Sequence, residues 1–329
     1  MDATTPLYEL ASSYWASSTL DAALELGVFP PLIHEACTAP ELAARLNCNP
    51  GTLNALLDAL AGLGLLRREA AGYTVSPERA PFLDPDSPDY LGGAFAFNRD
   101  LQGLWRRLPD CVRSGEPVMP ASPHLGQDPD RTRRFVEGMH SRAAVMARGL
   151  LQVVEPEPGS RILDLAGGPG TFSVRLLERD PSLSIIVFDL PPIVRAARDI
   201  HAGNPFGTSL TFQGGDYHQD ALPGNQDLLL YCGALHQEVP DALPGLLARM
   251  KAALNPEGRL LLVDLFLNED RATPLYAALF DLNMRLMRPS SHVHTVAGVE
   301  AALEPAGLTL VRSGDVPETP YRFVEAALA

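Results

Sequence analysis

The sequence predicts an α/β protein in which a doubly wound sheet follows a smaller, mostly α-helical N-terminal domain. Three observations favour this fold class. Short apolar runs alternate with helical patterns from residue 161 onward, which is typical of parallel strands joined by helices. A glycine-rich turn at 166–170 follows the first of these runs. Leucine-dense helices and a short hairpin lie earlier, between residues 7 and 75, and the 329 residues suffice for two domains, placed at 1–105 and 106–329.

Composition excludes several classes of protein. Apolar residues make up 46% and charged residues 20% of the chain, which is typical of a globular protein. The net charge of −14 would repel a nucleic-acid backbone. We expect neither a signal peptide nor a membrane span. We also expect no metal site and a reducing, cytoplasmic location, because the cysteines are scattered without metal-binding spacing at positions 37, 48, 111 and 232.

Helical patterns come first in the N-terminal domain. Gly27 and the two prolines after Phe29 are expected to end the first helical segment. Thr38 and Glu41 have the spacing of a capping box, which starts the next helix. Two short helices followed by a hairpin are typical of a winged helix. The predicted elements are helices over 7–33, 38–46 and 50–60 and strands over 63–68 and 72–75.

A winged helix can bind DNA or pack against another protein. The helix that would enter a major groove, 50–60, carries Asn54 and Asp58 but no lysine or arginine. Arg67 and Arg68 are the basic residues close by. Because phosphate contacts supply most of the affinity for DNA, a packing or dimerisation module is the favoured interpretation. A DNA-binding regulator stays the remote alternative.

Two helices are predicted between the hairpin and the glycine-rich turn. The first spans 90–108 and carries Phe97 and Trp105, which would pack in a core or line a pocket. The second spans 131–154 and leads the chain to the turn.

Five apolar runs predict the strands of the sheet, and polar residues follow four of them. Ligands of doubly wound sheets bind at the carboxyl ends of the strands. One acid at such an end is usually a helix cap, but four polar residues in succession indicate a binding site. The runs are 162–165, 185–189, 211–216, 228–232 and 260–264, and the polar residues are Asp189, Asp216, His236 and Asp264.

The residues at these ends suit a nucleoside. Gly167, Gly168 and Gly170 would let the backbone approach a ligand closely, although an ordinary tight turn is the alternative. They do not form the G-x-G-x-x-G dinucleotide pattern, and no lysine follows them, which excludes a P-loop. Asp189 lies about 20 residues further on, where an acid accepts hydrogen bonds from ribose hydroxyls. Asp216 and Tyr217 could flank an adenine.

Four motifs in this order resemble O-methyltransferases that depend on S-adenosylmethionine (SAM). The glycine-rich turn reads D-x-A-G-G-P-G and is similar to the D-x-G-x-G-x-G loop of such enzymes. The closest type is the two-domain group of plant caffeate enzymes, acetylserotonin enzymes and bacterial antibiotic-tailoring enzymes, and the resemblance covers nearly the whole chain. It implies a winged-helix dimerisation domain and a Rossmann-like methyltransferase domain. The motifs are 163–170, 188–191, 215–217 and 235–236.

The resemblance implies roles for the matching residues. His236 matches the general base of a Leu-His-Asp-Trp motif, and Asp264 stands where an acid orients that base. Gly167, Gly168 and Gly170 would bind the methionine part of SAM, Asp189 its ribose, and Asp216 and Tyr217 its adenine. The acceptor pocket would be lined by Phe135, Met139 and Met284. Arg285 and Arg288 lie beside Met284, and Arg288 is a candidate for binding an anionic acceptor, with solvated arginines as the alternative.

The chain departs from the family pattern near the base. Gln237 and Glu238 stand in place of Asp-Trp, and Val293 replaces the glutamate of Gly-Gly-x-Glu-x-Thr. C-, S- or N-methylation, or a use of SAM without methyl transfer, therefore stays an alternative. A metal site at His292 and His294 with His218 or Asp264 is disfavoured, because histidines two apart point to opposite sides of a strand.

The sequence therefore predicts an enzyme of small-molecule biosynthesis. It would transfer the methyl group of SAM to a hydroxyl of a small, aromatic or natural-product acceptor, releasing S-adenosylhomocysteine (SAH), with His236 as general base. We expect a cytoplasmic homodimer formed through the N-terminal domain, with neither nucleic acid nor membrane as a partner.

Overall fold

The computed structural model describes residues 5–119, 126, 128–288 and 290–329. The chain forms two compact units, residues 1–95 and residues 96–329. Within the described residues, no helix combines the length and the apolar character of a bilayer-spanning segment.

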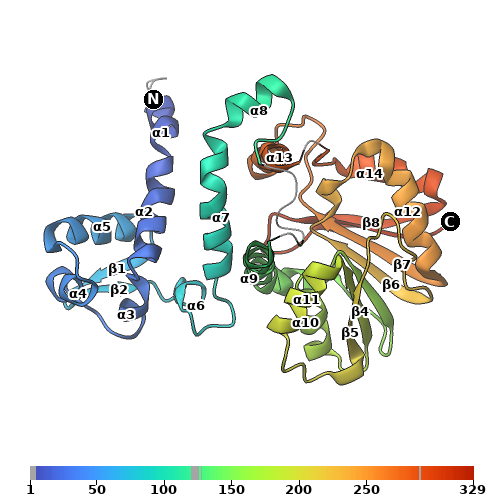
Figure 1. Cartoon of the computed structure of the whole chain (residues 1–329), viewed down its shortest axis with the longest axis horizontal. Coiled ribbons are helices and arrows are strands. Elements are labelled where there is room, and N and C mark those ends of the chain that lie inside the picture. The colour runs from blue at the N-terminus through green and yellow to red at the C-terminus, as the bar shows by residue number, and fades with distance from the viewer. Residues whose placement is uncertain (1–4, 120–125, 127, 289) are drawn as a thin grey trace. The chain divides into compact units, whose positions relative to one another are not determined.

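The first unit contains short helices and one hairpin (Figure 1). Its capping box is confirmed, since the Glu41 carboxylate accepts a hydrogen bond from the Thr38 N–H at 2.9 Å. The predicted hairpin is also confirmed, with Leu66 opposite Val75. The elements are α1 (Thr5–Ser12), α2 (Tyr14–Glu25), α3 (Phe29–His34), α4 (Ala39–Leu46), α5 (Pro50–Gly62), β1 (Leu66–Glu69), β2 (Gly72–Val75) and α6 (Ala80–Leu83).

The predicted helix over 7–33 is divided, and the role expected of its prolines is wrong. Gly27 adopts a left-handed φ of 69° and ends the helical path after α2. Helix α3 then begins at Phe29 with Pro30 and Pro31 in its first turn. A proline there leaves no hydrogen bond unmade, because the first N–H groups of a helix have no partner within it. The prolines therefore start a helix instead of ending one.

The second unit is organised by a seven-stranded sheet in its described residues, with the order β5-β4-β3-β6-β7-β9-β8. The five predicted strands are present, pair in parallel and form one side of this order. Strand β9 is antiparallel to both of its neighbours. The strands are β3 (Arg161–Leu165), β4 (Ser184–Asp189), β5 (Leu210–Gly214), β6 (Gln226–Cys232), β7 (Leu254–Asp264), β8 (Leu308–Asp315) and β9 (Arg322–Leu328).

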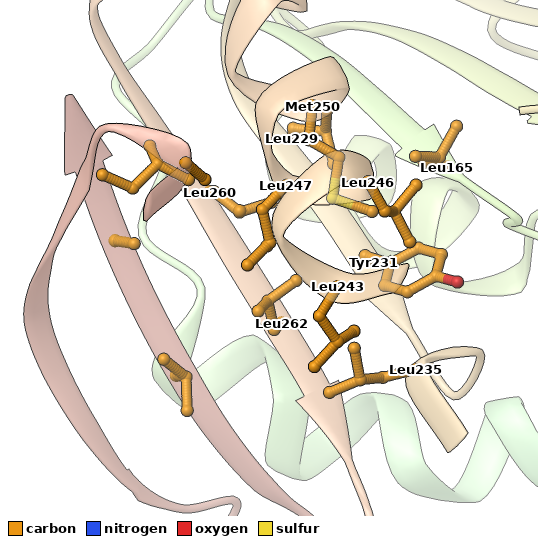
Figure 2. Packing of buried hydrophobic residues seen from close by; sticks show 14 of the residues in the cluster. Leu165, Leu229, Tyr231, Leu235, Leu243, Leu246, Leu247, Met250, Leu260 and Leu262 are labelled. Atoms are coloured by element: carbon orange, nitrogen blue, oxygen red, sulfur yellow. The ribbon is translucent and has the colours of Figure 1, made fainter. Parts of the chain in front are cut away.

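Helices cover both faces of the sheet. Alternate residues of one strand point to opposite faces, and each face packs into its own buried cluster. On β6, Leu229 and Tyr231 join one buried cluster, whereas Leu228 and Leu230 join the other. Figure 2 shows the first cluster, in which leucines of α12 pack on β6 and β7. The helices that contact the sheet or its covering helices are α9 (Pro129–Val153), α10 (Thr171–Arg179), α11 (Pro191–Ile200), α12 (Leu243–Ala253) and α14 (Val296–Leu303). The other helices are α7 (Gly92–Trp105), within which the division between the units falls, α8 (Leu108–Ser114) and α13 (Leu275–Met287).

This arrangement confirms the predicted α/β fold class. It also brings the carboxyl ends of β4, β3, β6 and β7 to one edge of the sheet, since these strands are parallel neighbours. The polar residues singled out in the sequence follow strands at that edge, so the site is assembled there.

Candidate active site

The glycine-rich turn between β3 and α10 needs residues without side chains. Gly168 and Gly170 adopt left-handed φ values of 55° and 71°. A Cβ atom on Gly170 would lie 2.9 Å from the Phe212 ring, and one on Gly167 would lie 2.6 Å from the Asp164 carboxyl carbon. Ala166 occupies the first glycine position of the pattern and itself has a φ of 52°. The turn therefore keeps its backbone open to a ligand at some conformational strain.

A buried acid lies under this turn. Asp164 is 0% exposed, and the Ser173 hydroxyl donates to its Oδ2 at 2.6 Å. Its Oδ1 has no hydrogen-bond partner among the described residues. Burial, with a smaller contribution from the nearby Asp189, raises the pKa of Asp164 to about 7. The signal for Asp164 in the sequence is its place as an acid inside an apolar strand run.

Asp189 is held against the turn, as its place at the end of β4 suggests. Its Oδ2 accepts a hydrogen bond from the Gly168 N–H at 2.8 Å, and its Oδ1 accepts one from the Leu190 N–H at 2.6 Å. Burial raises the pKa of Asp189 to about 6, against the effect of these two hydrogen bonds. The structure thus brings Asp189 and the glycine-rich turn together.

Asp216 and Tyr217 lie in the loop after β5. The Asp216 carboxylate accepts hydrogen bonds from the His218 N–H and the Gln219 amide, at 2.9 and 2.8 Å, so it is engaged within its own loop. Tyr217 points its hydroxyl to another segment and donates to Glu238 Oε1 at 2.7 Å.

The histidine and the acid expected to orient it are in contact. His236 is 8% exposed and Asp264 is 1% exposed. Asp264 Oδ1 lies 3.0 Å from His236 Nδ1, while its Oδ2 accepts a hydrogen bond from the backbone N–H of His236 at 3.1 Å. The Leu265 N–H donates to the same carboxylate at 2.7 Å. A carboxylate on Nδ1 fixes the tautomer in which Nε2 can take a proton.

Two further residues contact His236. The Phe280 ring on α13 meets the imidazole edge to face, with centroids 4.8 Å apart. The His292 N–H donates to the His236 carbonyl at 2.9 Å. No sequence motif marks Phe280, but it lies four residues before Met284 and therefore on the same face of α13.

The segment that departs from the family pattern is packed and hydrogen-bonded. Val293 is fully buried, and its N–H donates to Asp281, which also binds Arg285. The expectation that His292 and His294 point to opposite sides is wrong, because this segment is not a strand and their rings lie 5.0 Å apart. No group of three metal-binding side chains occurs within the described residues.

The residues assigned to the acceptor pocket lie on two helices. Phe135 and Met139 are half-buried on α9, one turn apart, and the Phe135 ring contacts Phe97 of α7 at 5.8 Å. Met284 is buried on α13, and Arg288 lies at the end of that helix, where its N–H donates to the Met284 carbonyl. Helices α7 and α13 are joined by a hydrogen bond from the Trp105 indole to Asn283.

Comparison with known families accounts for both units. Residues 105–309 match the model of an O-methyltransferase domain, and residues 8–78 match that of an O-methyltransferase dimerisation domain. The chain belongs to the O-methyltransferase family. The predicted enzyme class and its methyl donor, SAM, are thereby confirmed, as is the presence of an N-terminal dimerisation domain.

Individual relatives agree over almost the full length. The 3-hydroxy-5-methyl-1-naphthoate 3-O-methyltransferase of Streptomyces sahachiroi is 31% identical and covers 94% of this chain and 90% of its own length. The tetracenomycin polyketide synthesis 8-O-methyl transferase of Streptomyces glaucescens is 30% identical, with coverages of 95% and 94%. Among solved structures, human N-acetylserotonin methyltransferase in complex with SAM has a TM-score of 0.87 at 25% identity, with coverages of 100% and 98%.

Proposed function

We propose that the enzyme methylates a hydroxyl group of a small aromatic or natural-product acceptor, with His236 as the general base. The observation that carries this proposal is the His236–Asp264 pair, with Nδ1 and Oδ1 3.0 Å apart. His236 follows β6, and Asp264 is the last residue of β7. Strand β6 lies next to β3, the strand that precedes the glycine-rich turn. A base would thus lie next to the donor site.

The residues of the turn fit SAM. Among the described atoms, none would lie within 4 Å of a Cβ on Gly168, so the backbone there can be approached closely. We assign the methionine part to Gly167, Gly168 and Gly170, and the ribose to Asp189, whose carboxylate can accept from both hydroxyls. Asp216 and Tyr217 are assigned to the adenine. When bound, SAM supplies an electrophilic methyl group on a positively charged sulfur.

His236 supplies the proton transfer that the acceptor needs. A phenol has a pKa of ~10 and is mostly protonated at neutral pH. We infer that Nε2 of His236 takes the phenolic proton while Asp264 stabilises the imidazolium that forms. With SAM held by the glycine-rich turn and Asp189, the deprotonated oxygen would lie in line with the methyl group, and the leaving group would be SAH. Holding the two reactants in line contributes several kcal/mol on its own.

The acceptor pocket is assigned to Phe135, Met139, Met284 and Arg288. One relative is named for an acceptor that combines a hydroxyl with an aromatic carboxylate, and an arginine suits such an anion. Of the two arginines considered, Arg285 is engaged by Asp281 at 3.0 Å. Arg288 is therefore the better candidate.

The family match and the names of the relatives favour hydroxyl groups over the C-, S- and N-methylation alternatives. They also disfavour a DNA-binding regulator. Arg67 and Arg68, the basic residues of the hairpin, are paired with Glu78 and Asp58 at 2.8 and 3.2 Å. Phosphate contacts would have to compete with both pairs.

We assign residues 1–105 to a winged-helix dimerisation domain and residues 106–329 to a Rossmann-like methyltransferase domain. A homodimer is supported by the family of the N-terminal residues. It is also supported by large apolar side chains that are 61–76% exposed on α1 and α2, namely Leu7, Tyr8, Leu10, Tyr14 and Trp15. A cytoplasmic location stays a prediction.

The proposed function is tested by binding and by turnover. Calorimetry should detect SAH binding by the purified enzyme. Incubation with SAM and a set of hydroxynaphthoates and naphthols should give SAH and an O-methylated product for at least one of them. Binding of SAH without O-methylation, together with methylation of an amine or thiol analogue, would contradict the assignment to a hydroxyl.

A further inference from the structure

A buried carboxylate that the proposed mechanism does not use lies two residues after His236. Glu238 is 4% exposed. Its Oε1 accepts a hydrogen bond from the Tyr217 hydroxyl at 2.7 Å and lies 3.3 Å from the Tyr231 hydroxyl. His218 Nε2 lies 3.4 Å from the same oxygen. Burial raises the pKa of Tyr217, and the Glu238 charge raises it further, so this hydroxyl stays a donor.

The contact joins two distant parts of the sheet edge. Tyr217 follows β5, the outer strand on this side, whereas Glu238 follows β6. Strands β4 and β3 lie between them in the sheet. The hydrogen bond therefore spans the part of the edge between β5 and β6, where Asp189 and the glycine-rich turn lie. The backbone of Tyr217 is held as well, since its carbonyl accepts a hydrogen bond from Arg249 of α12 at 3.0 Å.

Both ends of Glu238 are held. Its backbone carbonyl accepts a hydrogen bond from His294 Nε2 at 3.0 Å. Its carboxylate lies against the hydroxyl of Tyr231, which is fully buried on β6. A charge-assisted hydrogen bond from a tyrosine to such an anchored carboxylate restricts the ring to one orientation. Glu238 stands where the family motif has tryptophan, so a side chain of different chemistry occupies this position.

We propose that Glu238 is a positioning residue for the methyl donor: it holds the Tyr217 ring in the orientation that receives the adenine. This inference rests on the role proposed above for Tyr217. It predicts that the hydrogen bond contributes to the affinity for the nucleoside part of the donor, and that the two residues act as one unit.

The test measures affinity by calorimetry with two probes, SAH and 5′-methylthioadenosine, which share adenine and ribose. Tyr217→Phe keeps the ring and should weaken both probes about tenfold, and Glu238→Gln should weaken both about fivefold, because a charge-assisted bond is lost or replaced by a neutral one. The double variant should be no weaker than Tyr217→Phe alone. Tyr73→Phe is the matched control, since the buried Tyr73 also donates to a carboxylate, Asp58, at 2.7 Å. It should leave both affinities unchanged.

Unchanged affinities in folded Tyr217→Phe and Glu238→Gln would overturn the inference while leaving the proposed function in place. Additive losses in the double variant, or an equal loss in Tyr73→Phe, would also overturn it. If Glu238→Gln does not fold, Tyr217→Phe decides by itself. Failure of the unsubstituted enzyme to bind SAH would instead overturn the proposed function, and the inference with it.

Discussion

The two sides of the active-site edge are built in different ways. The glycine-rich turn, Asp164 and Asp189 come from one stretch of the chain, the β3-α10-β4 unit, and the Asp189 carboxylate is held by two backbone N–H groups. The base side is assembled from separate segments, since His236 is contacted by Asp264, Phe280 and His292. One side depends on the local backbone conformation of one stretch, whereas the other depends on groups that tertiary packing brings together from separate segments.

Because of this difference, we expect substitutions on the two sides to change different measured quantities. Substitutions in the turn should change the affinity for the donor and the free energy of unfolding, because they strain the backbone. Substitutions on the base side should change turnover with little effect on donor affinity.

His236→Ala should reduce turnover by about 10²-fold or more, because the acceptor proton loses its base. The affinity for SAH, measured by calorimetry, should stay nearly unchanged. Asp264→Asn should also reduce turnover, since an amide can favour the wrong tautomer of His236. His34→Ala is the control, because His34 is exposed at the end of α3. Full turnover in folded His236→Ala would remove this residue from the mechanism.

Gly170→Ala should weaken SAH binding about tenfold and lower the free energy of unfolding by about 2 kcal/mol. The reason is a left-handed φ of 71° and the 2.9 Å approach to Phe212 that a Cβ would make. Urea unfolding and calorimetry measure the two effects. Gly245→Ala in α12 is the matched control: no described atom lies within 4 Å of its added Cβ, and a helical alanine should be neutral or slightly stabilising. Equal losses in both variants would contradict the argument from backbone strain.

The same contrast explains what the sequence could predict. The five parallel strands and the residues at their ends follow from apolar runs and their punctuation, and the family resemblance added the pairing of His236 with Asp264. Strands β8 and β9 were not predicted. The apolar residues of β8 are confined to its first half and are mostly exposed, and β9 carries Glu325, which is buried between Arg259 and Arg312. The contacts of Phe280 and Glu238 depend on tertiary packing, which no local pattern encodes.

The next prediction concerns the buried acid under the turn. Burial raises the pKa of Asp164 from 3.8 to about 7, so the folded state binds more protons than the unfolded state between pH 4 and 7. Stability is therefore lost as pH rises through this window. Asp164→Asn should remove this loss, about 1 kcal/mol between pH 6 and 7.5. The measurement is urea unfolding of both proteins at the two pH values.

The difference between the two proteins isolates Asp164 together with its interaction with the nearby Asp189. His140, whose pKa burial lowers to about 4, has the opposite sign, since its contribution to stability is lost as pH falls from 6.5 toward 4. It contributes in the same way to both proteins. A stability difference between the two proteins that does not depend on pH would contradict the assignment.

The smallest expected effect is that of a chelator, which should leave turnover unchanged. His292 and His294 form a close histidine pair near the base, with ring centroids 5.0 Å apart, but the Glu238 carbonyl accepts a hydrogen bond from His294 Nε2 at 3.0 Å. A metal ion at this nitrogen would have to displace that hydrogen bond and find a further ligand. Turnover with and without EDTA, before and after adding Zn²⁺ or Mg²⁺, is the measurement. Inhibition by EDTA that a metal ion reverses would show that the base side needs a cation. The base side would then differ from the donor side by metal coordination and not by packing alone.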